Sequence, residues 1–254
     1  MSAGKITVDG IRQMKGEAPI AALTAYDYSM AKMLDACGVP LLLVGDSLGM
    51  VSLGLPDTTG VTMEDMIHHT RAAARANPRA LLAADLPAES YLTTDVAVSN
   101  AQRLMEAGAE AVKAEGGIVI CEQVRAIVAQ GIPFLGHLGM LPQSVKEEGG
   151  YKIKGRQADE AAALRDDANA LVDAGAFAMV LELVEPNVAA ELTAALPIPT
   201  IGIGSGPDCD GQILVTTDLW ATSPDYIPRH VQPREQVKSE MQAAVQNWMD
   251  ELKR

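Results

Sequence analysis

Short apolar runs alternate with longer helical stretches along the chain, and this alternation constrains the fold more than any other feature. Seven runs have the length and apolar character of buried parallel strands, and an eighth is weaker. They span residues 20–27, 41–46, 80–85, 111–115, 132–137, 177–182, 199–204 and, for the weaker run, 213–218. The segments between them have helical periodicity and end near Gly or Asn. Eight strand–helix periods predict an α/β protein, a (β/α)8 TIM barrel.

The length of the chain agrees with a single domain. A chain of 254 residues, 48% of them hydrophobic, can bury one large core and has the usual size of an α/β barrel. We therefore expect residues 1–254 to form one catalytic barrel domain with a C-terminal helix around 233–252. The alternative is an open doubly wound sheet, which needs a glycine-rich turn after its first strand. The sequence "TAYDYS" at 24–29 does not supply that turn.

Charge and cysteine content indicate the compartment and exclude two classes of partner. The net charge of −13 gives no basic surface for nucleic acid or for an anionic membrane. No apolar run approaches the ~18 residues that a membrane span needs, and residues 1–20 lack the apolar region of a signal peptide. Cys37, Cys121 and Cys209 are far apart, which is typical of buried thiols in a reducing compartment. We expect a cytoplasmic protein without nucleic-acid or membrane partners.

Polar residues stand at the ends of the predicted strands. They are Asp27, Asp46, Asp85, Glu115, His137, Glu182, Ser205 and Asp218. The carboxyl ends of barrel strands converge on one face, and this face carries the chemistry. Asp27 and Asp218 are equally well explained as helix caps. Chance capping is a poor explanation for the four other carboxylates together, so the pattern predicts an active site.

Three of these carboxylates predict a metal site. Asp46, Asp85 and Glu115 end neighbouring strands, and they would repel one another unless a cation lay among them. An all-oxygen site suits Mg²⁺. Lys113 stands two residues before Glu115, so both side chains point to the barrel interior. Lys113 then either pairs with a ring carboxylate or holds a substrate carboxylate.

Glu182 is the first candidate for a general base. It ends an apolar strand away from the proposed metal, where burial raises a carboxyl pKa into the useful range. His137 is the second candidate, since a lone histidine is more often structural. His68 and His69 lie in a helical segment and are expected to be surface or packing residues.

Two loops could contribute to the site. The polar segment 140–157, "MLPQSVKEEGGYKIKGRQ", follows the fifth run and is expected to form a lid or a substrate loop. The sequence "IGIGSG" at 201–206 either holds phosphate or allows close approach of the backbone to a ligand or helix.

An ordered series of motifs runs through roughly residues 18–218: "TAYDYS", "VGDSLGM", "ADLP", "VKAEGG", "GHLGMLPQS", "GGYKIKGR", "LEL", "IGIGSG" and "DGQILV". In this order the motifs resemble those of the ketopantoate hydroxymethyltransferase family. This resemblance implies a transferase of pantothenate biosynthesis. In that family a hydroxymethyl group passes from 5,10-methylenetetrahydrofolate to 3-methyl-2-oxobutanoate through a Mg²⁺-stabilised enolate, which gives 2-dehydropantoate. The resemblance also implies a homo-oligomer, a decamer of stacked pentamers.

The resemblance assigns roles to particular residues. It makes Asp46, Asp85 and Glu115 the Mg²⁺ site, some of them through water. It places Asp46, Ser47, Asp85 and Lys113 against the 2-oxo acid and makes Glu182 the proton acceptor. The resemblance assigns no role to His137, which we expect from its strand-end position to support the site from outside the first layer of ligands.

The loops that flank these motifs depart from the family pattern and leave two alternatives open. Gly60 stands where proline is expected, Leu141 replaces threonine, and Thr217 replaces histidine. One alternative is a C–C lyase or mutase of the phosphoenolpyruvate mutase and isocitrate lyase type, whose loop carries a cysteine that "GGYKIKGR" lacks. The other is a metal-binding paralogue without catalytic activity.

Overall fold

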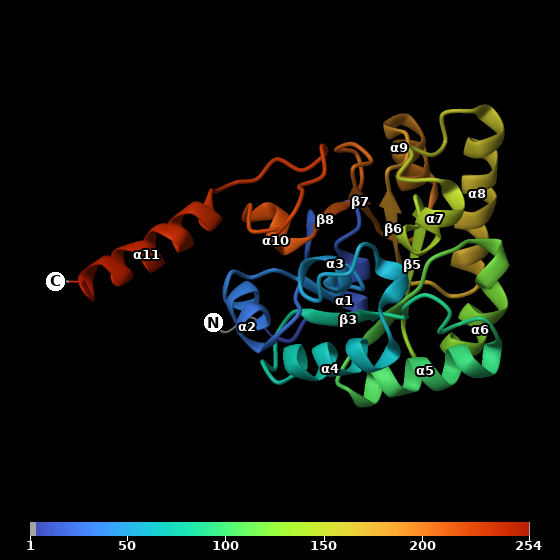
Figure 1. The fold of residues 1–254 in the computed structure, drawn as a ribbon. Coiled ribbons are helices and arrows are strands. Elements are labelled where there is room, and N and C mark those ends of the chain that lie inside the picture. Colours follow the sequence, from blue (N-terminus) through green and yellow to red (C-terminus); the bar gives the residue numbers. More distant parts are fainter. Residues whose placement is uncertain (1–3, 254) are drawn as a thin grey trace.

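A computed structural model describes residues 4–253, and its eight parallel strands close into a barrel in chain order (Figure 1). The strands are β1 (Ile20–Thr24), β2 (Leu41–Val44), β3 (Leu81–Asp85), β4 (Ala111–Lys113), β5 (Phe134–Gly139), β6 (Ala178–Glu182), β7 (Thr200–Ile203) and β8 (Gly211–Leu214). This confirms the predicted (β/α)8 barrel.

Helices surround the barrel, as the helical periodicity between the strands predicts (Figure 1). The longer ones on the barrel are α2 (Tyr28–Ala36), α4 (Met63–Ala74), α5 (Thr94–Glu106), α6 (Cys121–Ala129), α8 (Ala158–Asp173) and α9 (Pro186–Ala195). Side-chain caps begin several of them: Thr62 and Asp65, the latter in the first turn, form a capping box at α4, and Thr93 caps α5. Short helices α1 (Val8–Gln13), α3 (Leu48–Val51), α7 (Val145–Glu148) and α10 (Thr216–Leu219) lie in the connections.

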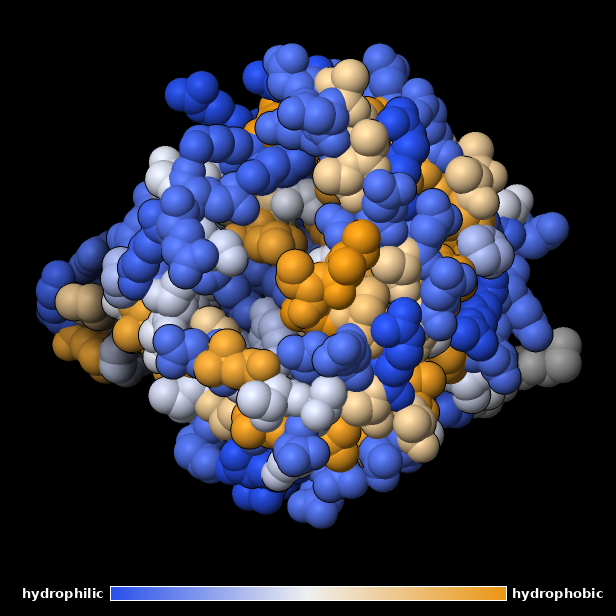
Figure 2. Space-filling view, turned by 90° about the vertical axis from the view of Figure 1, so that its right-hand side faces the viewer, coloured by the Kyte–Doolittle hydropathy of each residue, from blue (hydrophilic) through white to orange (hydrophobic). Residues whose placement is uncertain are grey.

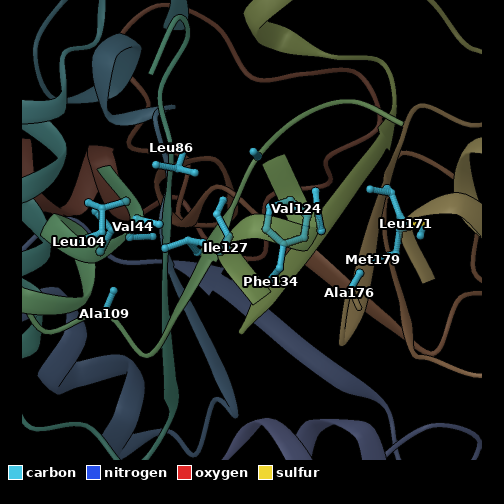
Figure 3. Close-up of a cluster of buried hydrophobic side chains, with 14 of the residues drawn as sticks. Val44, Leu86, Leu104, Ala109, Val124, Ile127, Phe134, Leu171, Ala176 and Met179 are labelled. Atoms are coloured by element: carbon cyan, nitrogen blue, oxygen red, sulfur yellow. The ribbon is translucent and has the colours of Figure 1, made fainter. Parts of the chain in front are cut away.

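Two apolar clusters hold the barrel together. The larger one lies between strands and helices, where Phe134 and Val44 meet helix residues such as Leu104 and Leu171 (Figure 3). The smaller one fills the barrel interior, and Ile11 of α1 packs into it with no exposed surface. Because this packing fills the interior, the polar residues at the carboxyl ends of the strands are fixed on a rigid support.

The eighth strand differs from its prediction. It begins at Gly211 and ends at Leu214, whereas 213–218 was expected, and residues 216–219 form helix α10. The reason is a pair of bonds to β1: Thr216 N–H donates to Thr24 Oγ1 at 3.0 Å, and Thr216 Oγ1 donates to the Thr24 carbonyl at 2.6 Å. These bonds replace the strand ladder and turn the chain into a helix.

The C-terminal helix expected around 233–252 is α11, which begins at Val237 and ends at Glu251 and projects away from the barrel (Figure 1). Its side chains are exposed, including Met241, Val245 and Trp248.

The surface, the helices and the cysteines can be compared with what the composition predicts. Hydrophilic residues dominate the face in Figure 2, with apolar residues in smaller groups between them. Across residues 4–253, no helix combines the length and the apolar character that crossing a membrane requires. Cys121 is buried, but Cys37 is exposed and Cys209 is half-buried. The prediction that all three thiols are buried was therefore wrong. Cys37 ends α2 at the surface, which the spacing of the cysteines could not indicate.

Candidate active site

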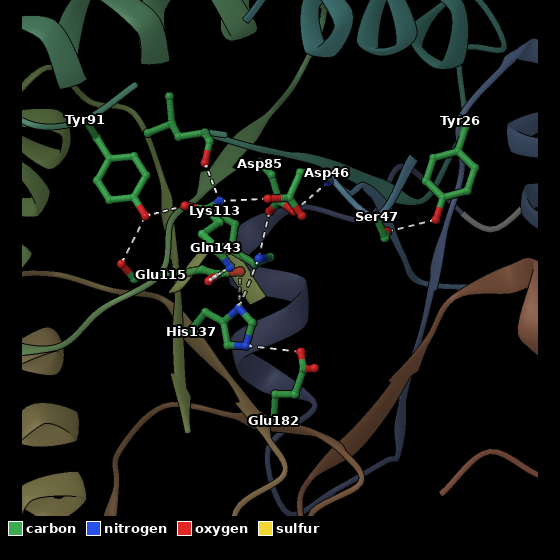
Figure 4. A network of polar contacts seen from close by, with 11 residues as sticks. Tyr26, Asp46, Ser47, Asp85, Tyr91, Lys113, Glu115, His137, Gln143 and Glu182 are labelled. Carbon is green, nitrogen blue, oxygen red and sulfur yellow. Dashed lines mark hydrogen bonds and ion pairs between the residues drawn. The ribbon is translucent and has the colours of Figure 1, made fainter. Parts of the chain in front are cut away.

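The predicted site residues meet in one cavity of about 190 Å³ at the carboxyl ends of the strands. Its lining includes Asp46, Ser47, Asp85, Lys113, Glu115, His137 and Glu182. Figure 4 shows most of them joined in a network of polar contacts. The barrel therefore brings together side chains that are distant in sequence.

Asp46 and Asp85 are fixed to each other through the backbone. The N–H of Asp46 donates to Asp85 Oδ2 at 3.0 Å, and both residues are almost fully buried. Burial and the nearby charge of Asp85 raise the pKa of Asp46 to about 7. Two buried carboxylates that repel each other make this part of the cavity strongly attractive to a cation.

Lys113 is the positive charge of the cavity. Its Nζ lies 2.9 Å from Asp85 Oδ1 and donates to His137 Nδ1 at 3.2 Å. Burial alone would lower the pKa of Lys113, but the charges of Asp85, Glu115 and Asp46 raise it above its ordinary value. The ion pair with a ring carboxylate, one of the two expected roles, is present, and the side chain also lines the cavity.

His137 is a neutral imidazole whose tautomer follows from its neighbours. Burial and the charge of Lys113 hold its pKa well below the usual range. Since Nδ1 accepts from Lys113, the proton is on Nε2, which lies 3.4 Å from Glu182 Oε2. His137 therefore presents an N–H to the carboxylate of Glu182.

Glu182 ends β6 and is the most accessible of the cavity carboxylates, with 13% of its side chain exposed. Burial raises its pKa to about 7, although the charges of Lys113 and His230 oppose the shift. A carboxylate with a pKa near neutrality can accept and return a proton at physiological pH.

Sequence reasoning missed Gln143 and Tyr91. Gln143 Nε2 donates to Asp46 Oδ2 at 2.7 Å, and its backbone N–H donates to Glu115 Oε2 at 3.0 Å (Figure 4). Tyr91 donates its hydroxyl to the amide oxygen of Gln143 at 2.5 Å. The available signal was the position of Gln143 in "LPQS", shortly after the strand that carries His137.

Three members of the predicted ring behave differently. Asp27 caps α2 by accepting from Met30 N–H at 2.8 Å, as one of its two expected roles required. Asp218 lies within α10 instead of at a strand end; it lines the cavity and accepts a bond from Ser223. Ser205 donates to the Leu181 carbonyl at 2.7 Å and accepts from Val184 N–H at 2.9 Å, so it attaches the loop after β7 to the end of β6 and the residues that follow it.

The remaining sequence features have local roles. A Cβ on Gly204 would lie 2.7 Å from Leu183, so the glycine loop permits close packing of the backbone. His69 Nδ1 donates to the Tyr26 carbonyl at 2.7 Å and His68 is exposed, so both are packing or surface residues, as expected.

The donor set fits a hard divalent cation that keeps part of its water shell. Within residues 4–253, no three His, Cys, Asp or Glu side chains are close enough to form a complete metal centre. Asp46 and Glu115 each give one oxygen to Gln143 and keep a second. Burial and the charge of Asp46 raise the pKa of Glu115 well above its usual range, which indicates negative charge without enough compensation. The three expected donors, Asp46, Asp85 and Glu115, are carboxylates, the ligands Mg²⁺ prefers, and water would complete the coordination.

The closed barrel, with titratable groups gathered at its strand ends, defines the chain as an enzyme of the (β/α)8 class. Within that class the sequence is specific. Residues 5–254 match the family model described as ketopantoate hydroxymethyltransferase, and the chain belongs to this family.

Curated relatives carry a matching name. The chain is 49% identical to a 3-methyl-2-oxobutanoate hydroxymethyltransferase of Moorella thermoacetica, over 98% of this chain and 94% of that protein. It is 48% identical to one of Pyrobaculum aerophilum, over 100% of this chain and 95% of that protein. The chain is therefore a hydroxymethyltransferase.

Solved structures share the fold alone. A phosphoenolpyruvate phosphomutase from Streptomyces platensis subsp. rosaceus superposes with a TM-score of 0.66 and 14% identity, over 97% of this chain and 88% of that one. A 2,3-dimethylmalate lyase gives a TM-score of 0.62 at 16% identity, over 97% and 87%.

Proposed function

We propose that the chain transfers a hydroxymethyl group from 5,10-methylenetetrahydrofolate to 3-methyl-2-oxobutanoate and so forms 2-dehydropantoate. The observation that carries the proposal is that one cavity holds both the cationic Lys113 and Glu182, a carboxylate whose pKa lies near 7. The first group suits the carboxylate of a 2-oxo acid, and the second suits removal of the proton at C3.

Substrate binding is assigned to Lys113, Ser47, Asp46 and Asp85. The Ser47 hydroxyl lies 2.9 Å from that of Tyr26, whose pKa is raised by burial, so both hydroxyls stay protonated. Lys113 offers the positive charge, held in place by Asp85 at 2.9 Å. These groups orient the acid so that C3 faces the opposite side of the cavity.

Asp46 and Asp85, with Glu115 directly or through water, are the residues that would hold Mg²⁺. When bound, the ion would stabilise the negative charge that develops on the substrate oxygens.

Proton removal is assigned to Glu182. Its carboxylate is ionised in about half of the molecules at its pKa of about 7. His137 Nε2 lies 3.4 Å from this carboxylate without a hydrogen bond to it in this structure, and the imidazole stays neutral because it is buried and Lys113 donates to its other nitrogen. The low exposure of these groups keeps water from competing for the proton.

The two alternatives are less well supported. Lyases and mutases share only the fold with this chain, at 14–17% identity, and "GGYKIKGR" has no cysteine to act as their acid. A paralogue without activity would not need Glu182 and Lys113 in one cavity.

We further propose a cytoplasmic homo-oligomer. The exposed apolar side chains of α11, among them Val245, Trp248 and Leu252, support self-association of the chain. Light scattering of the purified protein would give its mass.

The direct test of the reaction is turnover. Purified protein with 3-methyl-2-oxobutanoate, 5,10-methylenetetrahydrofolate and Mg²⁺ should form 2-dehydropantoate, measured by mass spectrometry. Cleavage of a C–C bond in a 2-hydroxy acid substrate instead would favour the lyase, and neither reaction would favour the inactive paralogue.

A further inference from the structure

We infer that Gln143 and Tyr91 form a positioning pair that holds the carboxylates of Asp46 and Glu115 in the orientation that binds the cation and the 2-oxo acid. The identity of these ligands rests on the proposed function, whereas the contacts do not.

Gln143 and Tyr91 lie outside the cavity, next to the carboxylates that line it. Gln143 is in the turn Pro142–Ser144 after β5, and Tyr91 lies in the connection after β3; both are half-buried. Pro142 lines the cavity, but within the described residues neither Gln143 nor Tyr91 does. The two residues therefore act on a ligand only through the groups they hold.

The side-chain amide of Gln143 has one possible orientation. Its Nε2 donates to Asp46 Oδ2 at 2.7 Å and to the Leu86 carbonyl at 3.0 Å. A carboxylate and a carbonyl only accept, so both hydrogens of Nε2 are used there. The amide oxygen then faces Tyr91, whose hydroxyl donates to it at 2.5 Å. A flipped amide would place its oxygen against the Asp46 carboxylate and the Leu86 carbonyl, which have no hydrogen to donate, and would lose the bond that Tyr91 donates; the same hydroxyl also lies 3.2 Å from the Glu115 carbonyl.

The backbone of Gln143 controls the second carboxylate. Its N–H donates to Glu115 Oε2 at 3.0 Å, while Glu115 Oε1 lies 3.5 Å from His137 Nδ1. One oxygen of Asp46 and one of Glu115 are thus committed to Gln143, and one of each remains. This arrangement limits rotation of both carboxylates and leaves a defined pair of oxygens for a ligand.

The same contacts attach a loop to the site. Gln143 belongs to the segment 140–157 that was expected to form a lid, and its bonds connect this segment to residues that follow β2, β3 and β4. The order of the carboxylates and the position of the segment are therefore linked by one side chain.

The test compares Gln143→Leu and Tyr91→Phe with the native protein. Leu keeps approximate size and removes the amide, so Mg²⁺ binding measured by calorimetry should weaken about 10- to 100-fold, the usual cost of losing a group that orients a metal ligand. Tyr91→Phe should weaken it in the same direction but less, since two bonds to the amide remain. The KM for the oxo acid should rise in both variants, while kcat at saturation should change little because Glu182 and His137 are untouched.

Gln123→Leu is the matched control. Gln123 is half-buried on α6, outside the cavity, and makes one long bond, 3.4 Å, to the Leu92 carbonyl, so this variant should bind Mg²⁺ like the native protein. Folding of each variant is checked by circular dichroism, and if Gln143→Leu does not fold, Tyr91→Phe alone decides.

Three outcomes would overturn the inference: native-like Mg²⁺ affinity in the folded variants, a fall in kcat with unchanged KM, or a native protein that binds no Mg²⁺. If the native protein binds Mg²⁺ but does not turn over, the proposed function fails, and calorimetry still decides the role of Gln143.

Discussion

His137 Nε2 lies 3.4 Å from Glu182 Oε2, and the two residues belong to the neighbouring strands β5 and β6. Lys113 occupies the other nitrogen of the imidazole at 3.2 Å, so the histidine can only donate toward Glu182. In the proposed function, this chain of contacts separates two roles within one cavity: cation and anion binding around Asp85, and proton transfer at Glu182.

Replacing Glu182 by Gln should remove the base and keep the size of the side chain. The expected loss is about 10²- to 10⁴-fold in kcat, the usual contribution of a general base, with little change in substrate affinity. The measurement is exchange of the C3 hydrogen of 3-methyl-2-oxobutanoate in D₂O with Mg²⁺ and without folate, which isolates proton removal from group transfer.

Glu191→Gln provides the control for that experiment, because Glu191 is exposed and pairs with Arg165 on the outer helices. It should exchange at the native rate. Native-rate exchange in Glu182→Gln would make His137 the better candidate for the base.

The pH dependence of catalysis should follow the ionisation of Glu182. Its pKa, raised by burial to about 7, lies above the ordinary value for glutamate, so the ionised fraction falls as the pH drops through 7. At saturating Mg²⁺, kcat/KM should be constant above this pKa and fall about tenfold per pH unit below it. If His137 were the base, activity would persist to much lower pH, because the pKa of His137 is held well below its usual range.

Asp85→Asn tests whether Asp85 belongs to the proposed binding site for the cation and the oxo acid. The change removes the charge that pairs with Lys113 and accepts from Asp46 N–H, so Mg²⁺ binding and the affinity for the oxo acid should both fall by more than about tenfold. Asp218→Asn changes a carboxylate that lies within α10 and bonds to Ser223, and it should have a much smaller effect. Chelation by EDTA should abolish native activity, and added Mg²⁺ should restore it. Equal losses in both variants, or full activity after chelation, would contradict the assignment.

The apolar runs were sufficient to predict the barrel and the face on which Asp46, Asp85 and Glu182 meet. Barrel topology gathers the carboxyl ends of the strands on one face, and local hydrophobicity locates each strand to within a few residues. Asp218 could not be placed in this way, because its position depends on two bonds between Thr216 and Thr24, which are distant in sequence. The same limit applies to Gln143, whose contacts depend on the path of a loop rather than on a periodic pattern. Residues that contact the cavity carboxylates without lining the cavity, such as Gln143, therefore cannot be predicted from the pattern of apolar runs in the sequence.

Gly139 of β5 packs directly against Glu182, the proposed base, on β6. Its φ is +97°, and a Cβ on it would lie 2.1 Å from the Glu182 carbonyl oxygen, which accepts from Met140 N–H at 2.8 Å. Gly139→Ala therefore requires both a strained backbone and a displacement of the residue that carries the base. Gly131→Ala is the matched control, since its φ is +75° but nothing lies within 4 Å of the added carbon.

The control should lose about 1–2 kcal/mol in the free energy of unfolding, the cost of a left-handed alanine. Gly139→Ala should lose clearly more, because β6 must move as well, and whatever protein remains folded should have a reduced kcat at native KM. Urea unfolding gives the first quantity and steady-state kinetics the second. Equal destabilisation of the two variants, with native kcat in Gly139→Ala, would mean that β5 and β6 adjust without moving Glu182.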